Sequence, residues 1–375
     1  MQFIDLEAQQ SVIKDALDKR IQCVMSHGKY IMGPEVFELE KKLSQFCGSK
    51  YAITCANGTD ALQLALMTLK VGVGDAVFVP SFTFAATAEI IPPLGATPIF
   101  VDVNPDTFNM DADSLKRCVL LAVEQGLKPV CVIPVDLFGL PADYDAIYDV
   151  ANEHEMTVIS DSAQGFGSIY KGKKSGTLGH ITTTSFFPAK PLGCYGDGGA
   201  LFTDNEEWAN MLSSLRFHGK GQDKYDNVRL GINSRLDTFQ AAILLEKLTI
   251  YPEEINKRLR VAKNYSSLLA GIIETPIVPN EYSSVWAQYT LKAKNSEERS
   301  QLMEFLKNQN IPTVIYYPLP LHQQSAYKSF PIDPSGCHMS ELVAEQVFSI
   351  PMHPYLSLDQ QKHIADVMRS YFNKY

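Results

Sequence analysis

Length, composition and charge set the first limits on this chain. It has 375 residues, of which 45% are hydrophobic and 20% are charged, a composition typical of a folded protein with a sizeable core. The formal net charge of -9 argues against nucleic acid as a partner, because binding to a phosphate backbone needs clustered Lys and Arg. No apolar stretch approaches the length of a membrane span, so no membrane partner is expected.

The N-terminus and the cysteines favour a cytoplasmic protein without a metal site. Residues 1–7 lack the basic region and the apolar run of a secretory signal peptide. The seven cysteines are dispersed, and no pair has the CxxC spacing of a zinc or redox motif. Such a set suits reduced thiols in the cytoplasm.

The first part of the chain alternates between short apolar runs and helical patterns. Two helices come first, at residues 9–26 and 36–46, where apolar residues recur at helical spacing. The following pattern predicts strands at 52–54, 76–80, 98–102, 129–134 and 157–161, with helices at 59–69, 85–94 and 143–155. This alternation indicates an α/β fold with a mostly parallel central sheet covered by helices.

Polar residues follow several of these strands. In open parallel sheets, ligands bind beyond the carboxyl ends of the strands. Asn57, Ser81, Asp136 and Asp161 all lie at or just after such ends. We therefore expect a ligand site at that edge of the sheet.

Residues 57–62 follow a strand and open a helix. The free N–H groups of a helix N-terminus form an anion site, where Gly58 would allow close approach and Thr59 would add a hydroxyl. The alternative is a plain N-cap, which Asn or Thr provides in many proteins. Further on, Phe84 could stack on an aromatic cofactor ring, but by itself an ordinary core phenylalanine explains it at least as well.

Lys190 carries the strongest chemical signal. It lies between Phe186-Phe187-Pro188 and a glycine-rich run that ends at Gly199, with no second charge before Asp197. Upstream, the short strand at 157–161 ends on Asp161. A lysine that forms a Schiff base and an aspartate that holds a pyridinium nitrogen are the pair that pyridoxal phosphate (PLP) chemistry requires.

Each of these residues also has a simpler explanation. An isolated lysine is usually a solvated surface charge, and Asp161 could cap a loop or a helix. Ser185 could reach the same anion as Thr59 or be a turn serine. In the segment 233–237, Asn233 could be a cap and Arg235 a structural ion pair.

The pattern changes near residue 244. A long helix is expected over 241–263 with a break or kink at Pro252, followed by a strand, two helices and an extended segment. Those later elements are expected at 286–293, 297–308, 358–372 and 313–317. The chain thus divides into a large α/β domain, 1–243, and a smaller C-terminal α+β domain, 244–375.

As an ordered set, these motifs resemble the DegT/DnrJ/EryC1/StrS sugar aminotransferase family, which has the PLP fold type I architecture. The resemblance covers nearly the whole chain. It rests on residues 33–36, 57–62, 80–84, 161–164, 185–190, 196–199 and 233–237. Within the family, the pattern is most similar to enzymes that aminate C3 of a UDP-2-acetamido-2-deoxy-3-keto-glucuronic acid. One departure is Tyr316, where that subfamily tends to have histidine.

The resemblance implies a role for each candidate residue. Lys190 would form the Schiff base and carry the proton, and Asp161 would pair with the pyridinium. The remaining cofactor-binding set is Gly58, Thr59, Asp60, Phe84, Gln164, Ser185 and Asn233, and the substrate-binding set is Arg235, Tyr316, Tyr317 and His322.

The resemblance also implies partners for the reaction. Glutamate would be the amino donor and a UDP-linked ketosugar the acceptor, in a homodimer in which Asn233 reaches the neighbouring subunit's cofactor. Two alternatives remain open. One is a different dTDP- or UDP-linked 3-keto sugar or 4-keto-6-deoxysugar as acceptor. The other is a catalytically silent or regulatory relative that binds a nucleotide.

Overall fold

The centre of the computed structural model, which describes residues 1–223 and 225–374, is a seven-stranded sheet. The strands are short and mostly buried, as expected for strands covered on both faces, although one of them begins at the exposed Lys128. Its strands are Tyr51–Cys55 (β1), Asp75–Pro80 (β2), Thr97–Val101 (β3), Lys128–Val132 (β4), Thr157–Asp161 (β5), Ile181–Ser185 (β8) and Gly199–Thr203 (β9).

The strand order in this sheet is β1-β9-β8-β5-β4-β2-β3. The pairs from β8 through β5, β4 and β2 to β3 are parallel, whereas β9 runs antiparallel to both β8 and β1. The mostly parallel sheet is therefore confirmed. The reversal at β9 agrees with its connection to β8, the loop of residues 186–198, which contains no crossover helix of the kind that usually joins parallel neighbours. That connection is the segment that carries Lys190.

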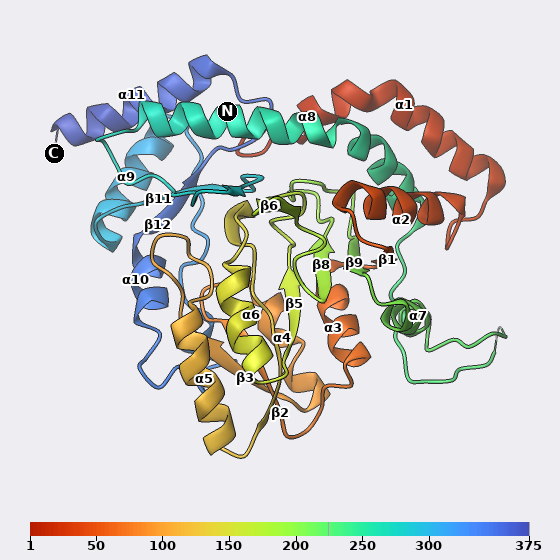
Figure 1. Cartoon of the computed structure of the whole chain (residues 1–375). Coiled ribbons are helices and arrows are strands. Elements are labelled where there is room, and N and C mark those ends of the chain that lie inside the picture. The colour runs from red at the N-terminus through yellow and green to blue at the C-terminus, as the bar shows by residue number, and fades with distance from the viewer. Residues whose placement is uncertain (224, 375) are drawn as a thin grey trace.

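Helices cover both faces of the sheet (Figure 1). On one face α3 and α7 pack against β1, β8 and β9, and on the other α5 and α6 pack against β3, β4 and β5. The helices up to residue 268 are Leu6–His27 (α1), Pro34–Cys47 (α2), Gly58–Thr68 (α3), Ala86–Glu89 (α4), Ala112–Glu124 (α5), Tyr144–Glu153 (α6), Glu206–Leu215 (α7) and Thr238–Leu268 (α8).

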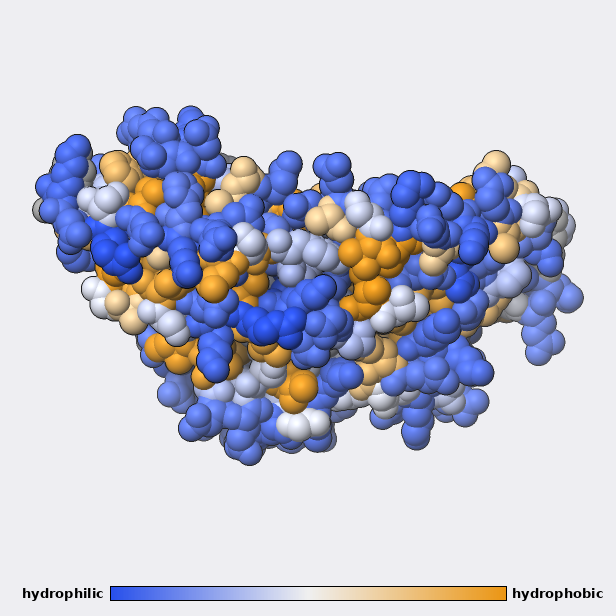
Figure 2. All heavy atoms as spheres, turned by 90° about the horizontal axis from the view of Figure 1, so that it is seen from above, coloured by the Kyte–Doolittle hydropathy of each residue, from blue (hydrophilic) through white to orange (hydrophobic). Residues whose placement is uncertain are grey.

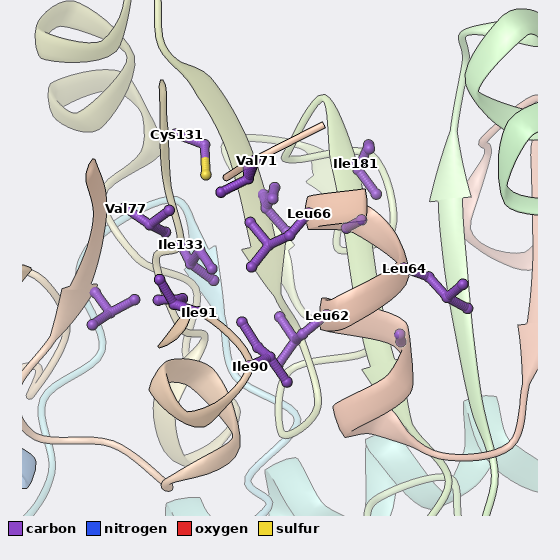
Figure 3. Close-up of a cluster of buried hydrophobic side chains, with 14 of the residues drawn as sticks. Leu62, Leu64, Leu66, Val71, Val77, Ile90, Ile91, Cys131, Ile133 and Ile181 are labelled. Atoms are coloured by element: carbon purple, nitrogen blue, oxygen red, sulfur yellow. The ribbon is translucent and has the colours of Figure 1, made fainter. Parts of the chain in front are cut away.

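Side chains of α3 build much of the core on its face of the sheet. Leu62 and Leu66 belong to a buried cluster with Val77 of β2, Ile181 of β8 and Ile133, which directly follows β4 (Figure 3). This packing fixes the N-terminus of α3 at the edge where β5 and β8 end. The site therefore has a rigid base.

The C-terminal part forms a smaller α+β unit. A two-stranded antiparallel sheet packs in one buried cluster with helices α9 and α11 and part of α8. The elements are Tyr289–Lys292 (β11), Ser296–Asn308 (α9), His338–Gln346 (α10), Val347–Ile350 (β12) and Leu358–Lys374 (α11). A third small sheet joins Tyr282–Ser283 (β10), Ile169–Tyr170 (β6) and Lys173–Lys174 (β7).

The proposed domain boundary between residues 243 and 244 falls within α8. This helix contacts α1, α2 and α11, so it belongs to both parts of the molecule. It bends in Figure 1 but continues through Pro252 without a break. The exact division of the chain stays a prediction.

Two local predictions need correction, and several elements were not predicted at all, among them α5, α7, α10, β8, β9 and β12. The helix expected at 85–94 consists of the short α4 and a separate 3-10 turn, Pro92–Leu94, because prolines lack the N–H that continues a helix. The segment 313–317 forms no strand, and within it only Val314 makes an isolated bridge, to Ser349.

The surface seen from above α8 and α11 is mostly hydrophilic, with small apolar patches between the polar side chains (Figure 2). Among the described residues, no helix is long and apolar enough to cross a membrane.

Candidate active site

A cavity of about 690 Å³ lies where β5 and β8 end and α3 begins. Its position agrees with the rule that ligands bind at the carboxyl ends of parallel strands. The predicted site residues that line it are Gly58, Thr59, Asp60, Phe84, Asp161, Gln164, Ser185, Lys190, Tyr316 and Tyr317.

Lys190 reaches this cavity from the short loop between β8 and β9. Its backbone N–H donates to the Phe187 carbonyl at 2.8 Å, and the Cys194 N–H donates to the Phe186 carbonyl at 2.7 Å. Burial lowers the pKa of the Lys190 amine, and the negative charge of Asp161 opposes that shift. The lysine is therefore not the solvated surface charge of the simpler explanation, and its neutral form is more accessible than that of an exposed lysine.

Asp161 ends β5 and is almost completely buried, with 5% of its surface exposed. Its Oδ2 accepts a hydrogen bond from the Thr87 hydroxyl at 2.9 Å, and its Oδ1 accepts one from the Ala163 N–H at 3.2 Å. Burial raises the pKa of Asp161, whereas these two hydrogen bonds and the charge of Lys190 lower it. A buried carboxylate of this kind gains most from a cationic partner in the cavity.

The N-terminus of α3 and the end of β8 lie against each other. Asn57 caps the helix, because its Oδ1 accepts from the Asp60 N–H at 2.8 Å, so the N-cap explanation holds. The N–H groups of Gly58 and Thr59 belong to the first turn, where a helix offers free donors. A Cβ on Gly58 would lie 2.7 Å from the Ser185 Cβ, so this close approach requires glycine.

Phe84 is not a core residue. Its side chain lines the cavity and is 55% exposed, which an apolar core site would not allow. Its ring centroid lies 6.2 Å from that of Tyr317. The two rings offer an apolar wall to a flat ligand.

Gln164 lines the cavity, but both ends of its amide already have partners in the protein. Its Nε2 donates to the Tyr317 hydroxyl at 3.1 Å, and its Oε1 accepts from the Phe138 N–H at 2.7 Å. A contact from Gln164 to a cofactor would therefore use the second N–H of the amide group that also holds Tyr317.

Tyr316 and Tyr317 form another part of the wall, with Ile4 and Gln288 beside them. The Tyr316 ring centroid lies 6.4 Å from that of Phe3, so the N-terminal segment closes this end. Burial raises the pKa of both tyrosine hydroxyls. At neutral pH both are uncharged hydrogen-bonding groups.

Asn233 and Arg235 do not line this cavity among the residues that the structure describes. The Arg235 guanidinium donates to the Asn233 Oδ1 and lies 4.5 Å from the centroid of the Phe217 ring. Within the described residues Arg235 makes no ion pair, so the structural ion pair considered above is not seen. Their role at a neighbouring subunit's site stays a prediction.

His322 also lies outside the set of described residues that line the cavity. Its Nδ1 is 2.5 Å from the Ser81 Oγ, and its Nε2 is 3.1 Å from the Glu341 Oε1. Both ring nitrogens thus have protein partners, and neither Ser81 nor Glu341 is among the described residues that line the cavity. A role for His322 in binding the substrate stays a prediction.

The chain was compared with known families and proteins. The family model described as DegT/DnrJ/EryC1/StrS aminotransferase family matches residues 11–369. The chain belongs to this family. The predicted family is therefore confirmed.

Two relatives show how close the match is. A protein from Pseudomonas aeruginosa named UDP-2-acetamido-2-deoxy-3-oxo-D-glucuronate aminotransferase is 47% identical over 366 residues, covering 97% of this chain and 98% of that protein. The crystal structure of a DegT/DnrJ/EryC1/StrS aminotransferase from Brucella abortus superimposes with a TM-score of 0.97 at 49% identity, covering 99% of each chain. The predicted fold class is confirmed.

A third relative concerns the cofactor. The PLP form of a putative sugar aminotransferase from Streptococcus pneumoniae has a TM-score of 0.87 at 27% identity, covering 96% of each chain. This likeness confirms the prediction of a PLP-dependent aminotransferase. The residues of this DegT-family chain fit the group: a buried carboxylate, an amine with a lowered pKa, an exposed aromatic face and free helix N–H groups share one cavity.

Several residues at the site were not predicted. Thr87 donates to Asp161 from the segment that carries Phe84, so a hydroxyl one turn after the aromatic residue was the available signal. Ile4 and Gln288 line the cavity from distant parts of the chain, and no local pattern marks them. No group of three or more His, Cys, Asp or Glu suited to a metal ion occurs among the described residues.

Proposed function

We propose that this chain transfers an amino group from glutamate to C3 of a nucleotide-linked ketosugar, UDP-2-acetamido-2-deoxy-3-keto-glucuronic acid. The observation that carries the proposal is the pairing of Lys190 and Asp161 in one cavity. The lysine has a lowered pKa and the aspartate is buried, and the two influence each other's charge. A strongly perturbed acid–base pair in a cleft is typical of a catalytic centre.

Bound PLP would supply an aldehyde that takes up and releases the amino group, and a ring that withdraws electrons from the reacting carbon. Asp161 would hold a proton on the ring nitrogen, because a buried carboxylate favours a cation beside it. Lys190 would move the proton at the reacting carbon, and burial makes its neutral amine available as a base.

The remaining cavity residues would position the cofactor. Gly58, Thr59 and Ser185 suit its phosphate, with Asp60 in the same turn of α3. Phe84 suits a stacked ring, because its exposed face lies in the cavity. Gln164 would support the site through its hydrogen bond to Tyr317.

The acceptor is proposed from the Pseudomonas aeruginosa relative, whose name specifies a UDP-linked 3-oxo-glucuronate. Tyr316 and Tyr317 would contact the sugar as neutral hydrogen-bonding groups. Arg235 would pair with the uronate carboxylate, since a guanidinium binds carboxylates through two parallel hydrogen bonds. The product would enter a surface polysaccharide such as the O-antigen of lipopolysaccharide.

The working unit is proposed to be a cytoplasmic homodimer with shared sites. Asn233 and Arg235 lie outside the described cavity lining of their own chain, which is what residues serving a neighbouring subunit's cavity require. In that arrangement Asn233 reaches the partner's cofactor phosphate and Arg235 its substrate.

The decisive experiment is a panel of UDP- and dTDP-linked 3-keto and 4-keto sugars, each incubated with glutamate and the PLP-loaded protein. Formation of 2-oxoglutarate and the amino sugar is measured by mass spectrometry. The proposal expects the UDP-3-keto-glucuronate to have the highest kcat/KM. A preference for a 4-keto-6-deoxysugar would favour the first alternative, which the replacement of histidine by Tyr316 makes the strongest competitor.

A second measurement separates an enzyme from a silent binding protein. PLP joined to Lys190 absorbs visible light, and borohydride removes that absorbance. A PLP-loaded protein whose absorbance is not bleached by borohydride, and which consumes no glutamate, would overturn the enzymatic assignment.

A further inference from the structure

We propose that Lys247 is a positioning residue that holds the loop of Lys190 against helix α8. This loop, residues 186–198, connects β8 to β9 and is called the lysine loop below. The inference rests on the proposed role of Lys190, and it concerns a residue about one-quarter of the way along α8, outside the cavity lining.

Lys247 is fully buried, with 0% of its surface exposed. Its Nζ donates a hydrogen bond to the Gly193 carbonyl in the lysine loop at 2.6 Å. The same ammonium lies 4.4 Å from the centroid of the Tyr195 ring. One buried cation therefore makes polar contacts with two residues of a loop that also packs on α8 through Leu192 and Cys194, in a buried cluster with Leu244 and Leu248.

Gln240, two turns earlier on α8, makes the second anchor. Its Oε1 accepts a hydrogen bond from the Tyr195 N–H at 2.9 Å. Lys247 and Gln240 thus hold neighbouring residues of the loop on the same helix.

The contacts that hold Gly193 and Tyr195 should also affect the position of Lys190, because the lysine loop is folded tightly on itself. A Cβ on Gly193 would lie 2.5 Å from the Pro188 carbonyl oxygen and 2.6 Å from that of Phe187. The Cys194 N–H also donates to the Phe186 carbonyl. A shift of Gly193 would therefore move the backbone that carries Lys190.

A buried lysine is unfavourable for folding unless a specific partner compensates for its lost hydration. Burial lowers the pKa of Lys247 to about 8, and the charges of Glu254 and Cys194 only partly oppose that shift. Glu254 is itself fixed, because it accepts hydrogen bonds from Gln9 and Tyr355. The amine of Lys247 therefore donates to one backbone carbonyl, and the acidic side chain that influences its charge is itself held by hydrogen bonds.

The test compares Lys247→Met with Lys257→Met in the PLP-loaded protein. Lys257 is a matched control, because it lies on the same helix with its Nζ 5.3 Å from the Tyr355 ring and, within the part of the chain that the structure describes, forms no hydrogen bond or ion pair with the lysine loop. Three quantities are measured: the dissociation constant of PLP, the pH at which the visible absorbance of the bound cofactor changes, and amide hydrogen exchange in residues 191–197.

Lys247→Met should weaken PLP binding by roughly tenfold or more, the loss expected for one hydrogen bond to a charged donor. It should also shift the absorbance titration and speed exchange in the loop, while Lys257→Met changes none of the three. A Lys247→Met protein that matches wild type in all three would overturn the proposal.

If Lys247→Met does not fold, Lys247→Gln replaces it, because its shorter side chain keeps a donor and should give smaller changes in the same directions. Failure of both variants to fold would assign Lys247 a purely structural role and end the proposal. Lys190→Ala distinguishes this inference from the proposed function. If Lys190→Ala is inactive but Lys247→Met is normal, only the positioning role is wrong.

Discussion

Two opposing influences act on the amine of Lys190. Burial lowers its pKa, and the nearby charge of Asp161 raises it. For Asp161 the direction of each influence is reversed. The two residues therefore stabilise each other's charged form in a cavity that disfavours an isolated charge, and each should be sensitive to replacement of the other.

Replacing Lys190 by alanine should remove turnover while the fold and weak PLP binding remain. Alanine offers neither a nucleophilic amine nor a proton carrier, so kcat should fall by roughly 10³-fold or more. Steady-state assays on the PLP-loaded variant measure this, with circular dichroism as the control for folding. Turnover near the wild-type rate would show that Lys190 is not the catalytic lysine.

Asp161→Asn should lose activity on the order of a hundredfold or more, because an amide cannot balance a protonated ring nitrogen in a buried site. The thermal midpoint of the PLP-free variant should stay the same or rise, since an uncharged amide avoids the cost of burying a carboxylate. Full activity together with a lowered midpoint would mark Asp161 as a structural cap.

At the scale of elements, the site depends on the contact between the first turn of α3 and the end of β8. Leu62 and Leu66 hold α3 in the core, so the helix cannot shift away from β8 when a larger side chain is placed at their contact. Gly58 is the point of closest approach, and only hydrogen fits between it and Ser185.

Gly58→Ala should therefore damage both stability and cofactor binding. The added Cβ meets the Ser185 Cβ, and such overpacking costs about 1–3 kcal/mol of the free energy of unfolding. PLP affinity should fall by roughly tenfold as the phosphate donors move. Urea unfolding and fluorescence titration with PLP measure the two effects.

Gly72→Ala is the control for that experiment, since its nearest atom would be the Leu94 carbonyl oxygen at 3.9 Å. It should leave PLP affinity unchanged. Equal PLP affinities for the Gly58 and Gly72 variants would argue against a phosphate site at the start of α3.

At the scale of the whole molecule, the proposed dimer would decide which residues share a site. Lys190 and Asp161 line one cavity of a single chain, whereas Arg235 is absent from the lining that the structure describes. Asn233 is exposed and Arg235 is half-buried, so both have surface that a neighbouring subunit could contact.

Mixing Lys190→Ala with Arg235→Ala subunits should therefore restore activity. In a mixed dimer one site carries both defects and the other carries neither, so random pairing allows recovery of at most roughly a quarter of wild-type sites. Co-expression with two different tags yields the mixed dimers for assay. Mixed dimers no more active than either parent would place Arg235 in its own subunit's site, or in none.

The matched control mixes Lys190→Ala with Asp161→Asn. Both residues come from one chain, so every mixed dimer keeps one defect in each site and should stay inactive. Recovery here would mean that Lys190 and Asp161 of one site come from different subunits, and the test of Arg235 would then fail.

The residues proposed to carry the chemistry were predictable because they lie in short continuous segments of the sequence. One reaction needs the residue types found in three such segments: the run from Thr184 to Gly199, the carboxylate that ends β5, and the motif that opens α3. The alternation of strands and helices gave the parallel sheet for the same reason: burial on both faces makes each strand a short apolar run. Asn57 was correctly considered as a helix cap.

The misses have different causes. Asp111 and the helical spacing of Leu115, Val119 and Ala122 are local signals for α5 that the prediction overlooked, and Pro92 and Pro93 divide the helix expected at 85–94. Thr87, Ile4 and Gln288 reach the site through tertiary contacts, without a local motif. His322 was expected in the cavity, yet its ring is held by Ser81 and Glu341.

By itself, the sequence determined the reaction class, because Lys190, Asp161 and the glycine-rich loop are local patterns tied to one cofactor chemistry. Only the tertiary structure decided which side chains meet in the cavity and which protonation state burial favours for them. It also decided that Lys247 reaches the lysine loop from 54 residues away. Contacts and desolvation depend on distances between segments remote in the chain, and no local pattern encodes those distances.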